Sequence, residues 1–141
     1  MDKYIGDAIL AIFGSPEKDP EHSEKAVRAA LEMQTAMGKL NVVRAARHMP
    51  PITIGIGIHR GEVVHGFIGT ADRMEFTVIG DAVNRASRYC AGAAGGEVVI
   101  SPELHQRVWK LVDAERIAIP TKHEGEFVAH RVKCLKEAAK V

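Results

Sequence analysis

Cysteine is scarce in this sequence. Only Cys90 and Cys134 occur among 141 residues, with no CxxC spacing and no other likely ligand beside them. A scaffold built on disulfides is therefore excluded. A structural zinc site is not expected either, since the seven histidines form no HExxH motif and no His/Cys cluster. Two isolated thiols are typical of a reduced cytosolic protein, so we expect a cytoplasmic location and buried or half-buried sulfur atoms.

The sequence also has no excess of one charge, few aromatic residues and no long apolar run. The 19 basic and 18 acidic residues leave a net charge of +1, and aromatics make up 5% of the chain. Nucleic acid is therefore not an expected partner. No apolar run approaches the roughly 20 residues that span a bilayer, and no signal-peptide core is visible, so this segment is not expected to insert into a membrane. The remaining composition is ordinary for a single globular domain over residues 1–141.

The tetrapeptide Ile-Gly-Asp-Ala occurs twice, and its two contexts predict different structures. In the first copy, Gly6 and Asp7 separate two short apolar runs, which predicts a two-residue hairpin turn with Asp7 at its tip. In the second copy, Asp81 follows a β-branched strand and precedes a helical run. That position predicts a carboxylate that caps the helix by accepting hydrogen bonds from its first free amides.

The helix that follows the second copy has two distinct faces. Asn84, Ser87 and Arg88 are three and four residues apart and share one face, opposite Val83 and Ala86. An amide and a guanidinium offered together suit an anionic, phosphate-bearing ligand. A solvated polar helix face explains the same residues, and both interpretations stay open at this point.

The first hairpin also allows two interpretations. Its strands carry apolar residues in both side-chain phases, as in a sheet covered on both faces, where Lys3 and Asp7 would need an ion pair, a metal or a solvated cleft. The alternative is an exposed turn aspartate and a lysine that reaches to solvent. The stretch GIGIHRG is not a dinucleotide loop, because its glycines are spaced GxGxxxG and no helix follows.

Periodicity and turn residues predict the other elements. A helix is expected from Ser23, stopped by the residues at 48–51, and a later helix is expected to start at the N-cap Ser101. The other segments are strands at 52–58 and 62–68 joined around 60–61, a polar connection at 70–75, a strand at 76–80, a helix at 81–93, a strand at 96–101, a helix at 101–112, and strands at 115–119 and 126–133. Because strands and helices do not alternate strictly, we expect an α+β fold with a mixed sheet and packed helices, not a doubly wound parallel sheet.

Four stretches together resemble the class III nucleotide cyclase catalytic domain, the adenylate and guanylate cyclase family, over essentially the whole chain. They are KYIGDAILAIFG, GIGIHRGEVVHGFIG, RMEFTVIGDAVNRASRYCAGAAGGEVVIS and EGEFVAHRV. The most specific is FTVIGDAVNRASR, which closely matches the motif of that family. The resemblance implies a ferredoxin-like fold with a mixed or antiparallel sheet, and a head-to-tail homodimer with its site between the protomers. The implied reaction converts a nucleoside triphosphate into a 3′,5′-cyclic monophosphate and pyrophosphate.

The resemblance also implies residue roles. Asp7 matches one of two aspartates that bind two Mg²⁺ or Mn²⁺ ions. Lys3 and Thr77 match the positions that read the base, and a lysine there favours ATP over GTP. The threonine at position 77 resembles the residue found at this position in the bacterial-type adenylate cyclases. Asn84 is implied to orient the ribose, and Arg88 to meet the negative charge that develops at the phosphoryl group.

The sequence departs from the family pattern in two places. Lys122 stands where a lysine followed by glycine usually contacts the terminal phosphates, but here His123 follows it. The strand that bears the first metal aspartate is not found before Met1, so we expect an N-terminally truncated domain of impaired activity with an exposed sheet edge, linked to sensor or regulatory domains in a longer protein. The alternative is a non-catalytic cyclase-like module that binds nucleotide or dimerises to regulate a partner.

Overall fold

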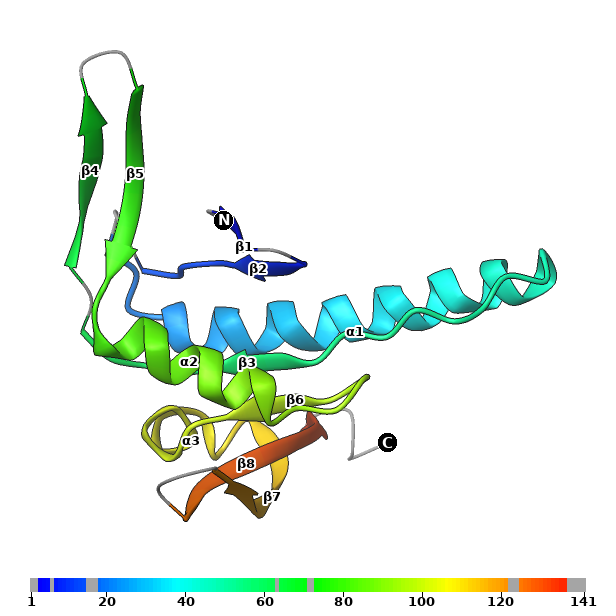
Figure 1. Cartoon of the computed structure of the whole chain (residues 1–141). Helices are drawn as coiled ribbons and strands as arrows, with labels where there is room; N and C mark the ends of the chain where they lie inside the picture. Colours follow the sequence, from blue (N-terminus) through cyan, green and yellow to red (C-terminus); the bar gives the residue numbers. More distant parts are fainter. Residues whose placement is uncertain are drawn as a thin grey trace.

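The computed structural model of the chain describes residues 3–5, 7–14, 18–62, 64–70, 73–121 and 125–136, and the side chains of residues 7–14, 18–62, 80–121 and 125–136. The elements follow the chain in the order β1 (Lys3–Ile5), β2 (Ala8–Leu10), α1 (His22–Ala46), β3 (Ile56–Ile58), β4 (Val64–Thr70), β5 (Arg73–Ile79), α2 (Asp81–Ala91), β6 (Val98–Ile100), α3 (Pro102–Val108), β7 (Val112–Pro120) and β8 (Glu126–Leu135). Figure 1 shows their arrangement.

The largest sheet among the described residues is mixed and has four strands. Its strand order is β3-β6-β8-β7, with β3 and β6 parallel and the other neighbours antiparallel. Together with the helices this is the α+β architecture expected from the sequence. Because successive side chains of a strand point to opposite faces, the apolar run Val98-Val99-Ile100 in β6 has to be covered on both sides.

Two hydrophobic clusters cover the two faces of β6. Val98 and Ile100 belong to a cluster with residues of α1 and α3, while Val99 belongs to a second cluster with Tyr89 of α2. The other buried members of the first cluster are Val27, Ala30, Leu104, Val108, Val112 and Val132, and those of the second are Ile119 and Ala129. The sheet therefore separates α1 and α3 from α2.

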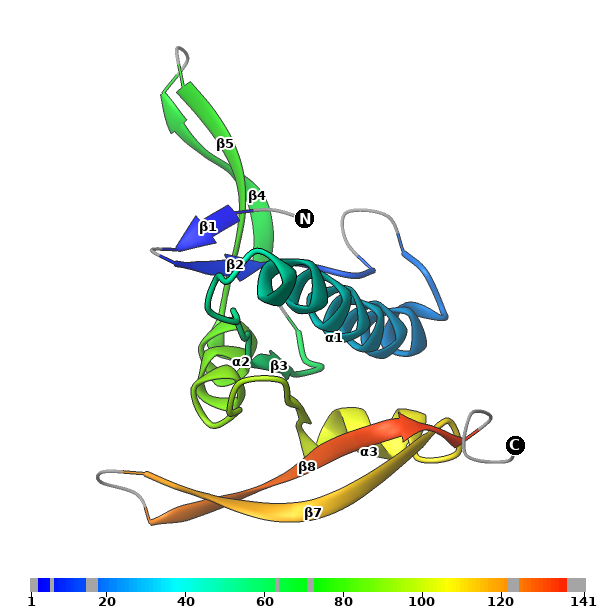
Figure 2. The ribbon, with the colours of Figure 1, turned by 90° about the vertical axis from the view of Figure 1, so that its right-hand side faces the viewer.

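Two antiparallel hairpins lie outside this sheet. In the first, β1 pairs with β2 with Ile5 opposite Ala8, which confirms the predicted two-residue hairpin and places Asp7 in its turn. In the second, β4 pairs with β5 up to Thr70 opposite Arg73. In Figures 1 and 2 the β1–β2 hairpin lies beyond β3, on the side away from β6.

The predictions for residues 52–75 were wrong in two respects. The expected strand at 52–58 is confined to Ile56–Ile58, because backbone groups before it bond to side chains of α1. The Asn41 side chain exchanges two hydrogen bonds with Ile52 at 2.7 and 2.8 Å, and Gln34 Nε2 donates to the carbonyl oxygen of Ile54 at 2.9 Å. The expected polar connection at 70–75 is largely strand, since pairing along the hairpin satisfies its backbone groups.

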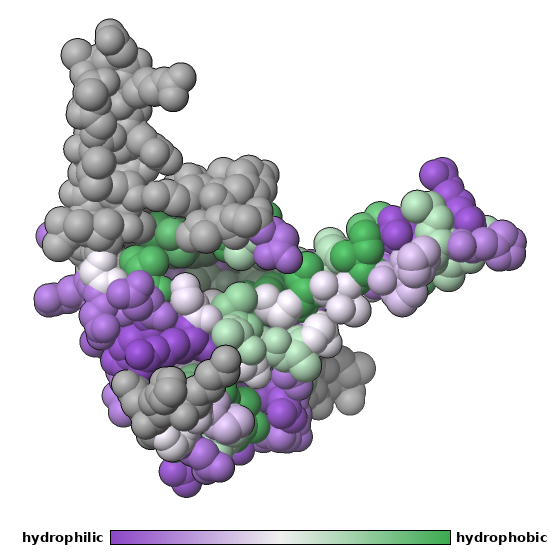
Figure 3. All heavy atoms as spheres, in the orientation of Figure 1, coloured by the Kyte–Doolittle hydropathy of each residue, from purple (hydrophilic) through white to green (hydrophobic). Residues whose placement is uncertain are grey.

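The helix predicted from Ser23 is longer than its buried face requires. It begins at His22, ends at Ala46, and is followed by His48 at a φ of 57°, a left-handed conformation that stops helices, so the predicted stop is confirmed. Only Val27 and Ala30 are buried on it. Its C-terminal half extends away from the sheet and carries exposed apolar side chains such as Val42 and Val43, as Figure 3 shows for this end of the molecule.

The remaining expectations were met with small shifts. Ser101 caps α3 as predicted, but this helix ends at Val108 rather than at residue 112, because Val112 already pairs with Leu135 in the sheet. Both cysteines are free and half-buried, as expected. Among the described helices, none combines the length and the apolar character that a bilayer crossing requires.

Candidate functional site

The first candidate residue, Asp7, lies in the exposed turn of the β1–β2 hairpin. The residue is exposed to solvent, as expected for an aspartate in a turn. Lys3 lies in β1 opposite Leu10, but its side chain is outside the described residues. The register of the hairpin therefore places Asp7 in the turn between β1 and β2.

The start of α2 corrects one prediction. Gly80, not Asp81, is the N-cap, and no side chain caps the helix. Gly80 has φ 141° and ψ 170°, a conformation that favours glycine, and its carbonyl oxygen accepts a hydrogen bond from Val83 N at 3.2 Å. This backbone path puts Asp81 one position further, in the first turn, where its exposed carboxylate stabilises the positive end of the helix dipole.

The two faces predicted for α2 are confirmed. Asn84, Ser87 and Arg88 are all exposed, whereas Tyr89 on the opposite side is 3% exposed. Asn84 and Arg88 are four residues apart, so their side chains are neighbours along one ridge of the helix. This ridge starts within the first turn after Gly80 and carries an amide and a guanidinium on an exposed face of the helix.

Close packing holds α2 on the sheet. A Cβ atom at Gly57 of β3 would lie 2.0 Å from the backbone nitrogen of Cys90, so the helix backbone rests directly on this strand. The ring of Tyr89 meets Phe127 of β8 edge-on at a centroid distance of 5.3 Å. The exposed ridge is thus carried by a helix whose other side is fixed against two strands.

The side chains of the other two candidate residues, Thr77 and Lys122, lie outside the described part of the chain. Thr77 lies in β5 opposite Gly66, but its side chain is outside the described part, and Lys122 is outside it altogether. Within the described side chains, no group of three or more His, Cys, Asp or Glu residues could hold a metal ion. Asp7 provides a carboxylate of the kind that Mg²⁺ prefers, but a single carboxylate is not a complete set of ligands.

A cluster of charged groups beside α2 was not expected from the sequence. His59, directly after β3, has a side chain only 3% exposed, and its Nδ1 lies 3.7 Å from Glu103 Oε2. Glu103 Oε1 accepts a hydrogen bond from Arg85 Nη2 at 3.1 Å. These three residues come from separate segments and form no sequence motif. Only the position of His59 at the end of a predicted strand could have indicated a role.

The pKa values of His59 and Glu103 are shifted by burial and by neighbouring charges. Burial lowers the pKa of His59, the positive charge of Arg85 lowers it further, and Glu103 and Asp81 oppose the shift. The neutral form of this imidazole is therefore favoured more than in an exposed histidine. Burial raises the pKa of Glu103, but hydrogen bonds from its own backbone amide and from Arg85 outweigh this, so its pKa lies below the usual value.

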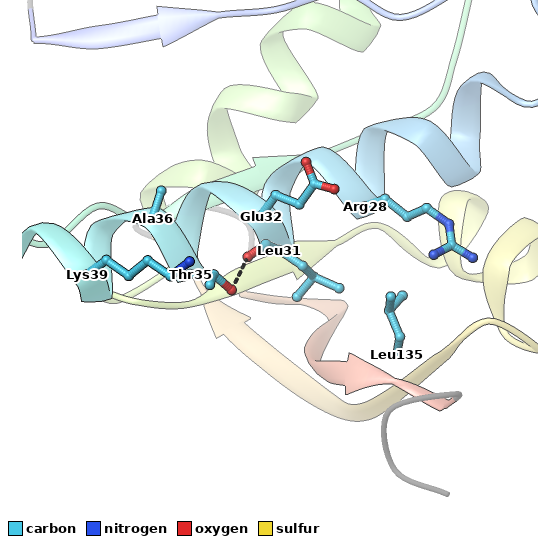
Figure 4. Close-up of a pocket in the computed structure, with 7 residues that line it drawn as sticks. All are labelled: Arg28, Leu31, Glu32, Thr35, Ala36, Lys39 and Leu135. Atoms are coloured by element: carbon cyan, nitrogen blue, oxygen red, sulfur yellow. Dashed lines mark hydrogen bonds between the residues drawn. The ribbon is translucent and has the colours of Figure 1, made fainter. Parts of the chain in front are cut away.

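A groove elsewhere in the molecule contains none of the candidate residues. It has a volume of about 390 Å³ and lies between α1 and the end of β8, as Figure 4 shows. Its lining residues are Arg28, Leu31, Glu32, Thr35, Ala36, Lys39 and Leu135. The Thr35 hydroxyl within it donates to the Leu31 carbonyl at 3.1 Å, a bond within the helix. The groove is therefore separate from the α2 ridge and from the β1–β2 turn.

Comparison with known proteins places the chain among nucleotide cyclases. The sequence model of the adenylate and guanylate cyclase catalytic domain family matches residues 3–132. An adenylate cyclase of Anabaena cylindrica is 49% identical over 92 residues, which are 62% of this chain and 17% of that protein. The chain thus spans less than a fifth of the length of this curated relative.

Solved structures agree with the sequence matches. The crystal structure of the guanylyl cyclase Cya2 superposes with a TM-score of 0.85 at 30% identity, covering 95% of this chain and 69% of that one. The adenylyl cyclase CyaB from P. aeruginosa gives a TM-score of 0.82 at 26% identity, covering 94% and 70%. Both carry the α+β fold described above.

Proposed function

The chain belongs to the adenylate and guanylate cyclase catalytic domain family, and from this premise we propose that it is part of an adenylate cyclase. The proposed reaction joins the ribose 3′-oxygen of ATP to the α-phosphorus, which gives 3′,5′-cyclic AMP and releases pyrophosphate. The observation that carries the proposal is the exposed Asn84–Arg88 ridge of α2, fixed from behind by Tyr89. An amide and a guanidinium presented together suit the ribose and phosphates of a nucleotide.

Each residue of the proposed site has one task. Asn84 orients the ribose so that its 3′-oxygen points at the α-phosphorus, and Arg88 stabilises the negative charge that develops on the phosphoryl oxygens. Lys122 holds the terminal phosphates. Phosphoryl transfer requires mainly positioning and charge stabilisation, which these side chains supply without covalent chemistry.

Lys3 and Thr77 are proposed to select the base. A lysine donates to acceptor atoms of the purine, and a threonine hydroxyl accepts from the exocyclic amine of adenine. The 49% identity with the Anabaena adenylate cyclase supports ATP as the substrate, although the similar structures include a guanylyl cyclase as well as an adenylyl cyclase. Replacement of Lys3 by glutamate is expected to lower the preference for ATP over GTP.

Asp7 fits a divalent metal ion as one ligand of a larger set. It is an exposed carboxylate in a turn, and Mg²⁺ is commonly held by one or two carboxylates together with substrate phosphates and water. Two Mg²⁺ or Mn²⁺ ions, when bound, would supply positive charge beside the reacting oxygens and the triphosphate. The described residues of one chain provide no complete set of ligands.

The site is proposed to form between two protomers that meet head to tail. The β1–β2 hairpin lies beyond β3 on the side away from β6 (Figures 1 and 2), whereas α2 packs against β3 on one face of the sheet. A head-to-tail pair would let Asp7 of one protomer work with Asn84 and Arg88 of the other. Each dimer would then contain two equivalent sites.

The test uses the full-length protein that contains this segment, with cyclic AMP measured from ATP in the presence of Mg²⁺ or Mn²⁺. Asp7→Ala is expected to abolish turnover, whereas Asp113→Asn, a change of an exposed carboxylate on β7, is expected to leave it unchanged. Turnover that survives in Asp7→Ala would show that its metal role is misassigned. ATP binding without turnover in the wild-type protein would favour the non-catalytic module instead.

A mixing experiment tests the shared site. The variants Asp7→Ala and Arg88→Ala are each expected to be inactive. Their equimolar mixture is expected to regain about a quarter of wild-type activity, because half of randomly formed dimers are mixed and each of these has one intact site. Subunit exchange has to be verified separately. If exchange occurs and the mixture still regains no activity, the proposal of a site built from two protomers is refuted.

A further inference from the structure

The imidazole of His59 is enclosed where β3, α2 and α3 meet. Its ring stacks on Tyr89 of α2 with a centroid distance of 5.8 Å and an interplanar angle of 28°. Tyr89 in turn packs edge-on against Phe127 of β8. The packing therefore fixes the plane of the imidazole relative to α2, although His59 itself belongs to the segment after β3.

One nitrogen of this ring has no hydrogen-bond partner within the part of the chain that the structure describes. His59 Nδ1 is buried and has no hydrogen-bond partner among the described residues. Its nearest carboxylate oxygen, Glu103 Oε2, is 3.7 Å away, beyond the usual hydrogen-bond distance. Buried polar atoms are normally paired, so an unpaired nitrogen this close to a carboxylate requires a reason.

The carboxylate of Glu103 lies near two groups that can carry positive charge. The guanidinium of Arg85 is always charged, whereas the imidazole of His59 is charged only when protonated. While His59 is neutral, Glu103 pairs with the guanidinium of Arg85 at 3.1 Å. A proton on Nδ1 would create a charge-assisted donor facing Glu103 Oε2, which would draw the carboxylate toward the imidazole and away from Arg85. Among the described side chains, the other titratable groups that face this ring are Asp81 and Tyr89, both on α2.

The spacing along α2 connects this cluster to the exposed ridge. His59 and Glu103 contact α2 through Arg85 and Tyr89, which are four residues apart. Asn84 and Arg88 are also four residues apart and precede those two residues by one position each. Since each residue advances the helix by about 100°, the two ridges are adjacent, and a rotation of one turns the other.

We propose that His59, acting through Glu103 and Arg85, is a positioning residue that sets the orientation of the Asn84–Arg88 ridge and changes it on taking up a proton. The catalytic consequence rests on the proposed function, because it assumes that this ridge contacts the nucleotide. The structural coupling does not rest on it and can be measured in the chain itself.

The first experiment measures the coupling by NMR in the 141-residue chain. The ring proton of His59 and the side-chain amide of Asn84 are followed as the pH is lowered from about 8 to 5, the range in which histidines titrate. The expected result is that both signals shift with one midpoint below 6.5. An Asn84 amide that does not respond while His59 titrates would overturn the proposal.

The variant Glu103→Gln removes the shared carboxylate without disturbing the core, since this side chain is 46% exposed. The response of the Asn84 amide is expected to disappear, while the midpoint of His59 falls further because an opposing negative charge is gone. Glu115→Gln is the matched control, because it neutralises an exposed carboxylate paired with Arg131 on the sheet and should leave both midpoints unchanged. An unchanged Asn84 response in Glu103→Gln would refute the route through Glu103.

The second experiment measures turnover against pH in the full-length protein. His59→Ala is expected to lower kcat by about ten- to a hundredfold, the loss typical of misplaced catalytic groups. His59→Asn, which keeps a polar nitrogen near Nδ1 but gains no proton, is expected to recover much of kcat and to lose the acid limb of the pH profile. An acid limb that persists unchanged in His59→Asn would overturn the catalytic part of the proposal.

The two experiments separate the two proposals. If the wild-type protein forms no cyclic nucleotide, the proposed function fails, and the NMR coupling still decides whether His59 positions the ridge. If cyclic AMP is formed but Asn84 does not follow His59, the positioning proposal fails and the cyclase proposal stands.

Discussion

The contact between Gly57 and α2 leads to the sharpest prediction from the structure. In Gly57→Ala the new Cβ atom would lie 2.0 Å from the backbone nitrogen of Cys90, and 2.5 Å from both Cys90 Cα and the carbonyl carbon of Tyr89. All three atoms belong to the helix backbone. No side-chain rotation can relieve the overlap, so α2 would have to move away from β3.

The size of the effect follows from this distance. Ordinary contact begins at 3.4 Å, so a separation of 2.0 Å requires a displacement of about 1.4 Å. Extra methyl groups in well-packed cores usually cost about 1–3 kcal/mol. Because the displaced helix also carries the buried Tyr89, we expect a loss at or above the upper end, about 3 kcal/mol, out of a typical total of about 5–15 kcal/mol.

The assay is urea unfolding followed by far-ultraviolet circular dichroism, since Trp109 is 51% exposed and a poor reporter of core packing. The matched control is Gly38→Ala in α1, where the new Cβ atom would meet nothing within 4 Å. There the better helix propensity of alanine should stabilise the chain by about 1 kcal/mol. The reasoning would be refuted if Gly57→Ala had the same unfolding midpoint as the wild type. It would also be refuted if Gly38→Ala were less stable than the wild type while Gly57→Ala were not.

Two further predictions concern stability. Ser101→Ala removes the N-cap hydrogen bond of α3, which has a length of 3.2 Å at a fully buried position. This loss should lower the free energy of unfolding by about 1–2 kcal/mol, which thermal unfolding measures. The control is Ser87→Ala, a change of an exposed serine that is expected to have little effect. The pKa values of His59, His105 and His130 are all lowered, chiefly by burial, so below about pH 6.5 the unfolded chain binds more protons and the free energy of unfolding should fall with falling pH. Each histidine can contribute a slope of at most about 1.4 kcal/mol per pH unit, and urea midpoints that are constant from pH 7.5 to 5.5 would contradict this account.

The elements that could be predicted from the sequence are those set by neighbouring residues. A two-residue turn at Gly6-Asp7 and a helix start at Ser101-Pro102 depend on local hydrogen bonds and backbone preferences, which a few letters define. The exposed face of Asn84 and Arg88 followed from helix periodicity in the same way.

The wrong predictions share a different cause. Residues 52–54 have the β-branched character of a strand, yet side chains of α1 take up their backbone hydrogen bonds. Asp81 has the residue type of an N-cap, but the conformation of Gly80 shifts the helix start by one position. In both cases the outcome depended on a competing partner that a short sequence window does not contain.

Local sequence patterns indicated the candidate residues, which are the turn carboxylate Asp7 and the exposed ridge of Asn84 and Arg88. A longer motif indicated the nucleotide cyclase family, to which the chain belongs. The groups behind that ridge depend on how distant segments pack. His59, Arg85 and Glu103 are separated by 26 and 18 positions along the chain and become neighbours because β3, α2 and α3 pack together. Local preferences act over a few residues, whereas a buried imidazole facing a shared carboxylate exists only once distant segments have closed around it.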